Sequence, residues 1–399
     1  MTPDVTDDSA IGQPAEEVCG LLAGILPDGV DIHRCLAAQA MGKIGDSRAV
    51  EPLVAALLDE DEDVRTDAAG ALAALADHGA TSQLMENLLG DPCTDVKLAA
   101  IDALVRLKEP EVIPWLQKLI KGRDEDIAWD DTEFYESGWD DWVDIQVKAI
   151  LGLAELGIAD SIPDFLEAMQ DEDAQELSET VFKALTRLGD PGVETLAGFL
   201  DDPDELRRRR AIMALSAITN ETVSGLLAAA LDDPSSMVRL AALQAMAERD
   251  PSAPGLPGMM EDDDSEVRAE AVRLCAAANP DRLLVLAGDK DTDVLKAVLG
   301  VLIEQPELIE AETLRAVIRP KLDHPDPHLT SVAAMVLAAS SPQETEDDLV
   351  QILADPTRPA DTPIGALPGS PRINSAHAVP PIIGGVTHKE RPLRAAALA

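Results

Sequence analysis

The chain has 399 residues, a formal net charge of −43 at pH 7, and a hydrophobic content of 46% that includes only 2% aromatic residues. Nucleic acids and anionic membrane surfaces are bound by basic surfaces, so this charge argues against both as the main partner. The scarcity of rings predicts a core of alanine, leucine and valine, and the length exceeds that of one small compact domain.

The N-terminal residues 1–13 are polar and acidic, and we expect them to form a disordered lead. They contain neither the basic nor the apolar region of a signal peptide, and no apolar run in the chain reaches transmembrane length. The four cysteines are scattered without metal-binding spacing, which is typical of thiols in a reducing compartment. They are Cys19, Cys35, Cys93 and Cys275. We therefore expect a cytoplasmic protein.

A first pair of helices is predicted over residues 14–26 and 30–44. In the second of these segments, apolar residues recur every four positions and so share one face of a helix, which we expect to pack in the core. This stripe consists of Ile32, Leu36, Ala40 and Ile44.

The next stretch, residues 47–77, supplies the pattern for the rest of the chain. Apolar residues recur at intervals of three and four over 49–58 and again over 64–75, which predicts two amphipathic helices. The segment between them, residues 59–63, is entirely acidic and cannot be core. The unit is therefore a helix, a tight acidic turn and a second helix.

This unit repeats along the chain with a period near 30 residues, which is typical of a solenoid because one helix pair cannot bury its own apolar face. The residues that carry the repeat are an acidic turn, a Val-Arg or Val-Lys step and an Ala-Ala-x-Ala-Leu stripe. The steps recur at Val96-Lys97, Val238-Arg239 and Val267-Arg268. Over residues 14–354 the pattern resembles the HEAT repeat, in particular the short alanine-rich form of the phycobilisome-lyase-like HEAT proteins. The resemblance implies an α-solenoid, in a family that includes lyases, hydroxylases, scaffolds and transport adaptors.

Eight further pairs are predicted, which makes an all-α solenoid of about ten HEAT-like helix pairs over residues 14–354. A last amphipathic stretch, 346–353, is expected to cap the end. The eight pairs are 80–89 with 96–107, 111–120 with 145–156, 161–169 with 177–188, 193–200 with 206–218, 223–231 with 237–247, 257–260 with 267–277, 283–287 with 294–303, and 314–322 with 329–338.

A ladder of basic residues stands near the start of the second helices, directly after a valine in four of the five cases. In HEAT-like stacks such a residue pairs with an acid in the turn of a neighbouring repeat, so we expect a structural role. The basic residues are Arg65, Lys97, Arg208, Arg239 and Arg268, and the acids available nearby are Asp63, Asp95, Asp204 and Glu266.

An insertion at residues 123–142 interrupts the repeat. Five of the nine aromatic residues of the chain lie in it, among many acids, although the rest of the core is built from alanine and leucine. Aromatic side chains ringed by charge are typical of interface hot spots; the alternative is a loop whose tryptophans clamp onto adjacent helices. The candidate partner-binding residues are Trp129, Phe134, Tyr135, Trp139, Trp142, Asp130, Asp131 and Asp140.

The C-terminal residues 355–399 are rich in proline and glycine, have no apolar periodicity and carry a small excess of basic residues, so we expect a disordered tail.

Because this tail buries no periodic face, its removal is expected to leave the thermal midpoint of unfolding nearly unchanged. A drop of more than a few degrees in a calorimetric scan would show that it packs on the solenoid. The alternatives for its role are an inert tail, a peptide that docks a partner, or one that folds back on the acidic body.

No pattern in the sequence proposes catalysis or a cofactor. None of the six histidines is followed by glutamate, whereas the HEAT-type hydroxylases hold a di-iron site on repeated His-Glu pairs. The nucleophile, phosphate-binding and dinucleotide-binding glycine motifs are also missing.

The sequence therefore favours a monomeric, non-enzymatic scaffold or adaptor. It would bind another protein, one with a basic surface, through the solenoid face and the insertion. The alternative is an accessory factor for a cofactor-bearing partner, either bilin-lyase-like or active in metalloenzyme maturation, and it rests on the lyase resemblance alone.

Overall fold

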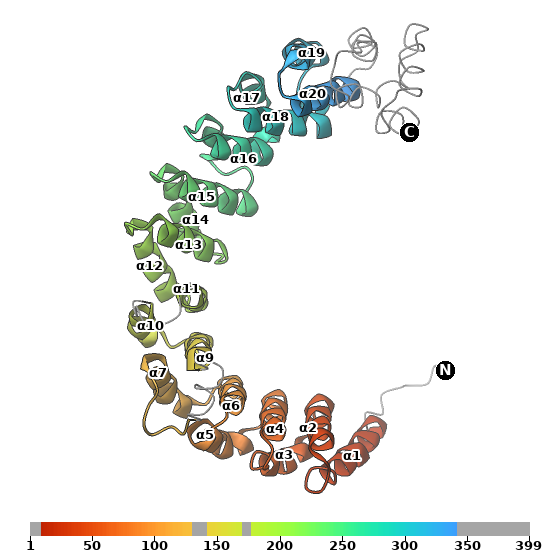
Figure 1. Ribbon diagram of the computed structural model, residues 1–399, viewed down its shortest axis with the longest axis vertical. Coiled ribbons are helices and arrows are strands. Elements are labelled where there is room, and N and C mark those ends of the chain that lie inside the picture. Colours follow the sequence, from red (N-terminus) through yellow and green to blue (C-terminus); the bar gives the residue numbers. More distant parts are fainter. Residues whose placement is uncertain (1–8, 130–141, 170–176, 341–399) are drawn as a thin grey trace, which may run out of the picture. The chain divides into compact units, whose positions relative to one another are not determined.

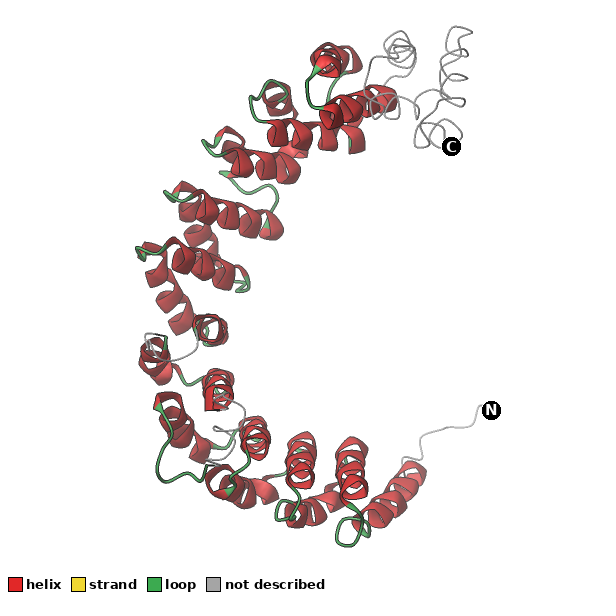
Figure 2. Cartoon of the chain, in the orientation of Figure 1, coloured by secondary structure: helices red, strands yellow, loops and turns green. Residues whose placement is uncertain are grey.

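The computed structural model describes residues 9–129, 142–169 and 177–340, and every regular element in that part of the chain is a helix (Figure 2). The chain divides into two compact units, Met1–Phe199 and Leu200–Ala399. The predicted cap at 346–353 and the tail at 355–399 lie outside the described residues, as do residues 1–8 of the lead.

The first unit is a series of short antiparallel helix pairs (Figure 1). Its second helices stack on one another in the order α2, α4, α6, α9 and α11. The helices are α1 (Ser9–Ala23), α2 (Asp31–Ile44), α3 (Val50–Ala56), α4 (Glu62–Leu75), α5 (Thr81–Gly90), α6 (Thr94–Arg106), α7 (Ile113–Lys121), α9 (Trp142–Glu155), α10 (Ile162–Ala168), α11 (Ser178–Arg187) and α12 (Asp190–Gly198).

The second unit has the same internal arrangement, with α13, α15, α16, α18 and α20 stacked in that order. The predicted helix at 257–260 is a 3-10 turn, Leu256–Glu261, because Pro257 and Gly258 interrupt the segment. The α-helices are α13 (Glu205–Ser216), α14 (Glu221–Ala229), α15 (Ser236–Arg249), α16 (Ser265–Cys275), α17 (Pro280–Leu286), α18 (Thr292–Glu304), α19 (Ala311–Ile318) and α20 (Pro327–Ser340).

Small residues set the spacing between stacked helices. A Cβ atom added to Gly42 of α2 would lie 2.8 Å from the Cα atom of Ala71 in α4, closer than real Cβ atoms approach. Ala37, Ala38 and Ala68 are also buried at 1% exposure or less in these two helices. The alanine-rich stripe of the sequence is therefore the surface on which successive repeats stack, and close stacking leaves no room for rings.

Two predictions at the N-terminal end were wrong. Helix α1 begins at Ser9, inside the stretch assigned to the disordered lead, and Pro14 does not mark its start. The stripe predicted for α2 is largely open, since Ile32 is 62% and Leu36 is 56% exposed. The face of α2 that packs on α4 is the alanine-rich one, and among the described residues no repeat precedes this pair to cover the other face.

Candidate functional site

The acidic turns of the sequence hold the repeats together. In the turn between α3 and α4, the Asp59 carboxylate accepts a hydrogen bond from the backbone N–H of Asp61 at 2.9 Å. Asp61 in turn caps α4 by accepting the N–H groups of Asp63 and Val64. These bonds satisfy backbone donors that the helix end leaves without partners. The acids of this turn therefore have a structural role.

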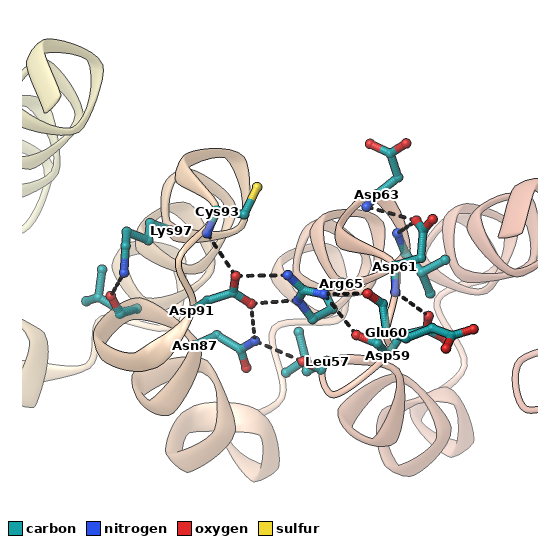
Figure 3. A network of polar contacts seen from close by, with 12 residues as sticks. Leu57, Asp59, Glu60, Asp61, Asp63, Arg65, Asn87, Asp91, Cys93 and Lys97 are labelled. Atoms are coloured by element: carbon teal, nitrogen blue, oxygen red, sulfur yellow. Dashed lines mark hydrogen bonds and ion pairs between the residues drawn. The ribbon is translucent and has the colours of Figure 1, made fainter. Parts of the chain in front are cut away.

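Arg65 joins this turn to the next one (Figure 3). Its guanidinium Nε and Nη2 atoms donate to the two carboxylate oxygens of Asp91 at 2.6 and 2.9 Å, while Nη1 donates to the carbonyl oxygen of Asp59 at 2.9 Å. Both side chains are largely buried, with 14% and 5% exposed. Asp91 also accepts the N–H of Cys93, so one carboxylate shapes its own turn and fixes the preceding repeat.

Arginine–aspartate pairs recur in other repeats; three of them bind both carboxylate oxygens, whereas Arg34 donates to one oxygen of Asp59 through Nη2. In each case the arginine also donates to a carbonyl oxygen of its own turn. The side-chain pairs are Arg34 with Asp59, Arg208 with Asp233, Arg239 with Asp262, and Arg268 with Asp289.

The acids proposed from the sequence were the wrong ones. Asp204, for example, caps α13 through the N–H of Leu206, while Arg208 binds the aspartate that opens the following turn. The sequence prediction also missed Arg34, which follows His33 rather than a valine. The signal that could have found it is the Ala37-Ala38 pair three residues further on.

The ladder changes in the repeat that precedes the insertion and in the repeat that contains it. Lys97, predicted to pair with a turn acid, is fully buried and donates through Nζ to the carbonyl oxygen of Leu88 at 2.9 Å. Gln146 takes the corresponding place in α9, and its Nε2 atom donates to the carbonyl oxygen of Ile120 at 2.6 Å. Here backbone carbonyls at the ends of α5 and α7 replace the aspartate of the next turn.

The start of the insertion packs back onto the preceding repeat. The backbone N–H of Ala128 donates to the carbonyl oxygen of Leu89 at 2.8 Å. The Trp129 indole N–H donates to the carbonyl oxygen of Asp124 at 3.2 Å. The Trp129 ring also lies 5.4 Å from Lys97 Nζ, a distance at which a cation is attracted to the ring face. The first anchor of the insertion is thus Trp129, seated over the altered ladder position.

The end of the insertion is fixed in the same manner. The Trp142 indole N–H, in the first turn of α9, donates to the carbonyl oxygen of Leu119 at 3.1 Å. The two described tryptophans of the candidate site therefore contact the solenoid. The remaining candidates lie outside the described residues. They are Asp130, Asp131, Phe134, Tyr135, Trp139 and Asp140.

The buried Lys97 gives a pH-dependent stability. Burial lowers its pKa from 10.5 to about 8, although Asp91 acts in the opposite direction. The unfolded chain then binds more protons between these two values, so stability rises with pH in that window. Relative to a Lys97→Met variant, we expect the wild type to gain about 2 kcal/mol between pH 7 and 9.5, measured by urea unfolding. Stability curves that run parallel over this pH range for the two proteins would contradict the lowered pKa of Lys97.

The described residues offer little for catalysis. No group of three or more potential metal ligands gathers within this part of the chain. Burial, with Asp67 nearby, raises the pKa of Cys35 to about 11, so its thiol is a poor nucleophile at neutral pH. Of the helices described, none is both long and apolar enough to cross a bilayer.

Comparison with known proteins identifies the repeats. The family model for HEAT repeats matches residues 20–89, 139–216 and 182–247. No curated protein sequence matches the chain.

Several solved structures resemble the fold. Kap121p bound to Nup53p is 12% identical with a TM-score of 0.53; the match covers 98% of this chain and 49% of Kap121p, so this chain spans about half of that protein. A chain from the CpcE and CpcF complex of phycocyanin lyase from a Nostoc species is 23% identical with a TM-score of 0.38, covering 69% of this chain and 96% of that one. Identities this low concern the fold alone. The matched repeats and the stacked helix pairs show that the chain belongs to the HEAT-repeat proteins.

Proposed function

We propose that this HEAT-repeat protein is a non-enzymatic scaffold or adaptor that binds another protein through the central part of its insertion, residues 130–141, together with the adjacent solenoid face. HEAT solenoids present extended surfaces on which partners bind. The observation that carries the proposal is the anchoring of both ends of the insertion, through Trp129 and Trp142, at the repeats where the arginine ladder lapses.

This anchoring divides the aromatic residues into two groups. Trp129 and Trp142 fasten the insertion, which agrees with the clamp alternative for those two residues. Between the two anchors in the sequence lie Phe134, Tyr135 and Trp139, none of which is a ladder position. We therefore assign partner binding to these three, since aromatic rings bury a large area at low cost in conformational entropy.

The charge of the insertion supports a partner with a basic surface. Asp130, Asp131 and Asp140 lie among other acids that repel one another and would be costly to bury without partners. Facing a basic surface, they would speed association and make binding weaken as the salt concentration rises.

Affinity capture from the native host tests the proposal. We expect the full chain to retain one partner, and a chain whose residues 130–141 are replaced by a glycine-serine linker of equal length to lose it. The replacement keeps both anchors, so its circular dichroism spectrum and thermal midpoint serve as the folding control. Equal capture by both chains would place binding elsewhere, and a coloured product that retains a chromophore would favour the cofactor-partner alternative.

A further inference from the structure

Two pockets flank the Asp232-Asp233 turn of the second unit, a region apart from the insertion. One, of about 370 Å³, lies between this turn and the turn that precedes α13, and its lining includes Leu226 and Val238. The other, of about 520 Å³, lies between the same turn and the 3-10 segment before α16, and its lining includes Leu231 and Met259. Each pocket thus combines an apolar part with the carboxylates of two neighbouring turns.

The ladder arginines neutralise only some of the carboxylates that line the two pockets. Arg208 and Arg239 line these pockets, but their guanidinium groups already bind Asp233 and Asp262 at 2.8 Å and 2.6 Å. The carboxylates that no ladder arginine binds are those of Asp201 and Asp232 at the first pocket, and those of Asp232 and Asp263 at the second. These three aspartates are exposed and form no ion pair with any residue that the structure describes. Both pockets therefore carry surplus negative charge beside an apolar wall.

This combination fits the side chain of arginine or lysine, which has an apolar stem and a cationic head. The pockets belong to successive repeats, and stacked helices lie about 8–10 Å apart. In a polyproline II segment, which has three residues per turn and rises about 3.1 Å per residue, side chains at positions i and i+3 point the same way about 9 Å apart. A segment with two basic residues three positions apart would therefore place one in each pocket.

The chain itself contains one such segment in its tail, Arg391-Pro392-Leu393-Arg394, in which the proline favours the polyproline II conformation. The other tail arginines, Arg358 and Arg372, are too far apart in sequence to match the pockets. Between Ser340, the end of α20, and Arg391 there are 51 residue steps (391 − 340), enough to extend well over 100 Å at about 3.3 Å per residue.

We propose that residues 391–394 bind intramolecularly to the two pockets, with one arginine near Asp201 and Asp232 and the other near Asp232 and Asp263. The contacts are solvent-exposed ion pairs, each of little energetic value alone, so the tail exchanges readily and adds little to folding stability. The pockets then form a second interaction surface, held by the tail until a stronger basic segment displaces it.

Photo-crosslinking in the full-length chain tests this docking. A photo-reactive amino acid in place of Leu393 is expected to give adducts that mass spectrometry maps to residues 200–202 and 228–263. The triple variant Asp201→Lys, Asp232→Lys and Asp263→Lys should lower their yield by about tenfold, because it removes every unpaired carboxylate of the site. The matched control, Glu248→Lys, Glu304→Lys and Glu312→Lys, changes three exposed acids of the same unit and should leave the yield unchanged.

Three outcomes would overturn the proposal. Equal adduct yields from the aspartate variant and its control would show attraction to the overall charge rather than to the pockets. Adducts joining two copies, detected as crosslinked dimers, would contradict intramolecular docking. No adducts in the mapped segments at low salt would show that the tail does not bind there.

Discussion

Replacing Arg239 with alanine is expected to lower the free energy of unfolding by about 3 kcal/mol. The guanidinium binds both oxygens of Asp262 at 2.8 and 2.6 Å and donates to the carbonyl oxygen of Asp233 at 2.9 Å. Only 15% of the arginine side chain and 5% of the aspartate side chain are exposed. Alanine would leave the Asp262 carboxylate buried without its partner, and burial already opposes its ionisation.

The loss should stay below about 5 kcal/mol, because Asp262 keeps the hydrogen bond from the N–H of Asp264. Arg239→Lys should lower the free energy of unfolding by an intermediate amount, since an ammonium group cannot reproduce the two parallel hydrogen bonds of the guanidinium. The matched control is Arg273→Ala in α16. It removes an exposed ion pair between Arg273 and Glu270 of that helix and should lower the free energy of unfolding by under about 1 kcal/mol.

Chemical denaturation measures these changes, with circular dichroism to follow the helices. A loss for Arg239→Ala no larger than that for Arg273→Ala would mean that the ladder does not hold the repeats together. The ladder arginines would then become candidates for binding an acidic partner.

The second expected result is the loss of partner capture in Trp139→Ala and Tyr135→Ala, with the helical content of the chain unchanged. Truncating a hot-spot ring costs about 2 kcal/mol or more of binding free energy, which corresponds to roughly thirtyfold in affinity. Neither residue belongs to the described helices or to the two anchors of the insertion. Trp129→Ala, by contrast, is expected to lower stability, because its ring covers the buried Lys97.

The outcome that would contradict this assignment is unfolding of the Trp139→Ala or Tyr135→Ala chain. Such a result would make the whole insertion a structural clamp and move the binding surface to the helices. A matched control is Trp115→Ala, which removes a ring of α7 that lies 4.5 Å from Lys118 Nζ, outside the insertion.

The sequence predicted the helix pairs closely where the repeat is regular. The segment 64–75 corresponds to α4, Glu62–Leu75, because the apolar period and the capping aspartate both mark that helix. Partner choice in the ladder was not predictable in the same way. Each turn holds several acids within reach of an arginine, and only the fold shows that the one opening the next turn, such as Asp91, receives the guanidinium.

Exposure at the first repeat also escaped sequence analysis. Ile32 and Leu36 have the spacing of core residues, yet burial depends on whether another element covers that face, which the local pattern does not encode. The two anchors of the insertion were likewise hidden. Trp129 and Trp142 look like Trp139 in composition and neighbours. Only the contact of the Trp129 ring with Lys97 and the hydrogen bond from Trp142 to the Leu119 carbonyl oxygen mark them as anchors.

Binding through the insertion is tested most directly by the dissociation constant of the isolated partner for wild-type protein and for Trp139→Ala, measured by calorimetry at low and high salt. We expect an affinity about thirtyfold or more weaker for the variant, and a wild-type affinity that falls as salt screens the acids of the insertion. Equal constants for the two proteins, with weakened binding by Trp115→Ala instead, would contradict binding through the insertion.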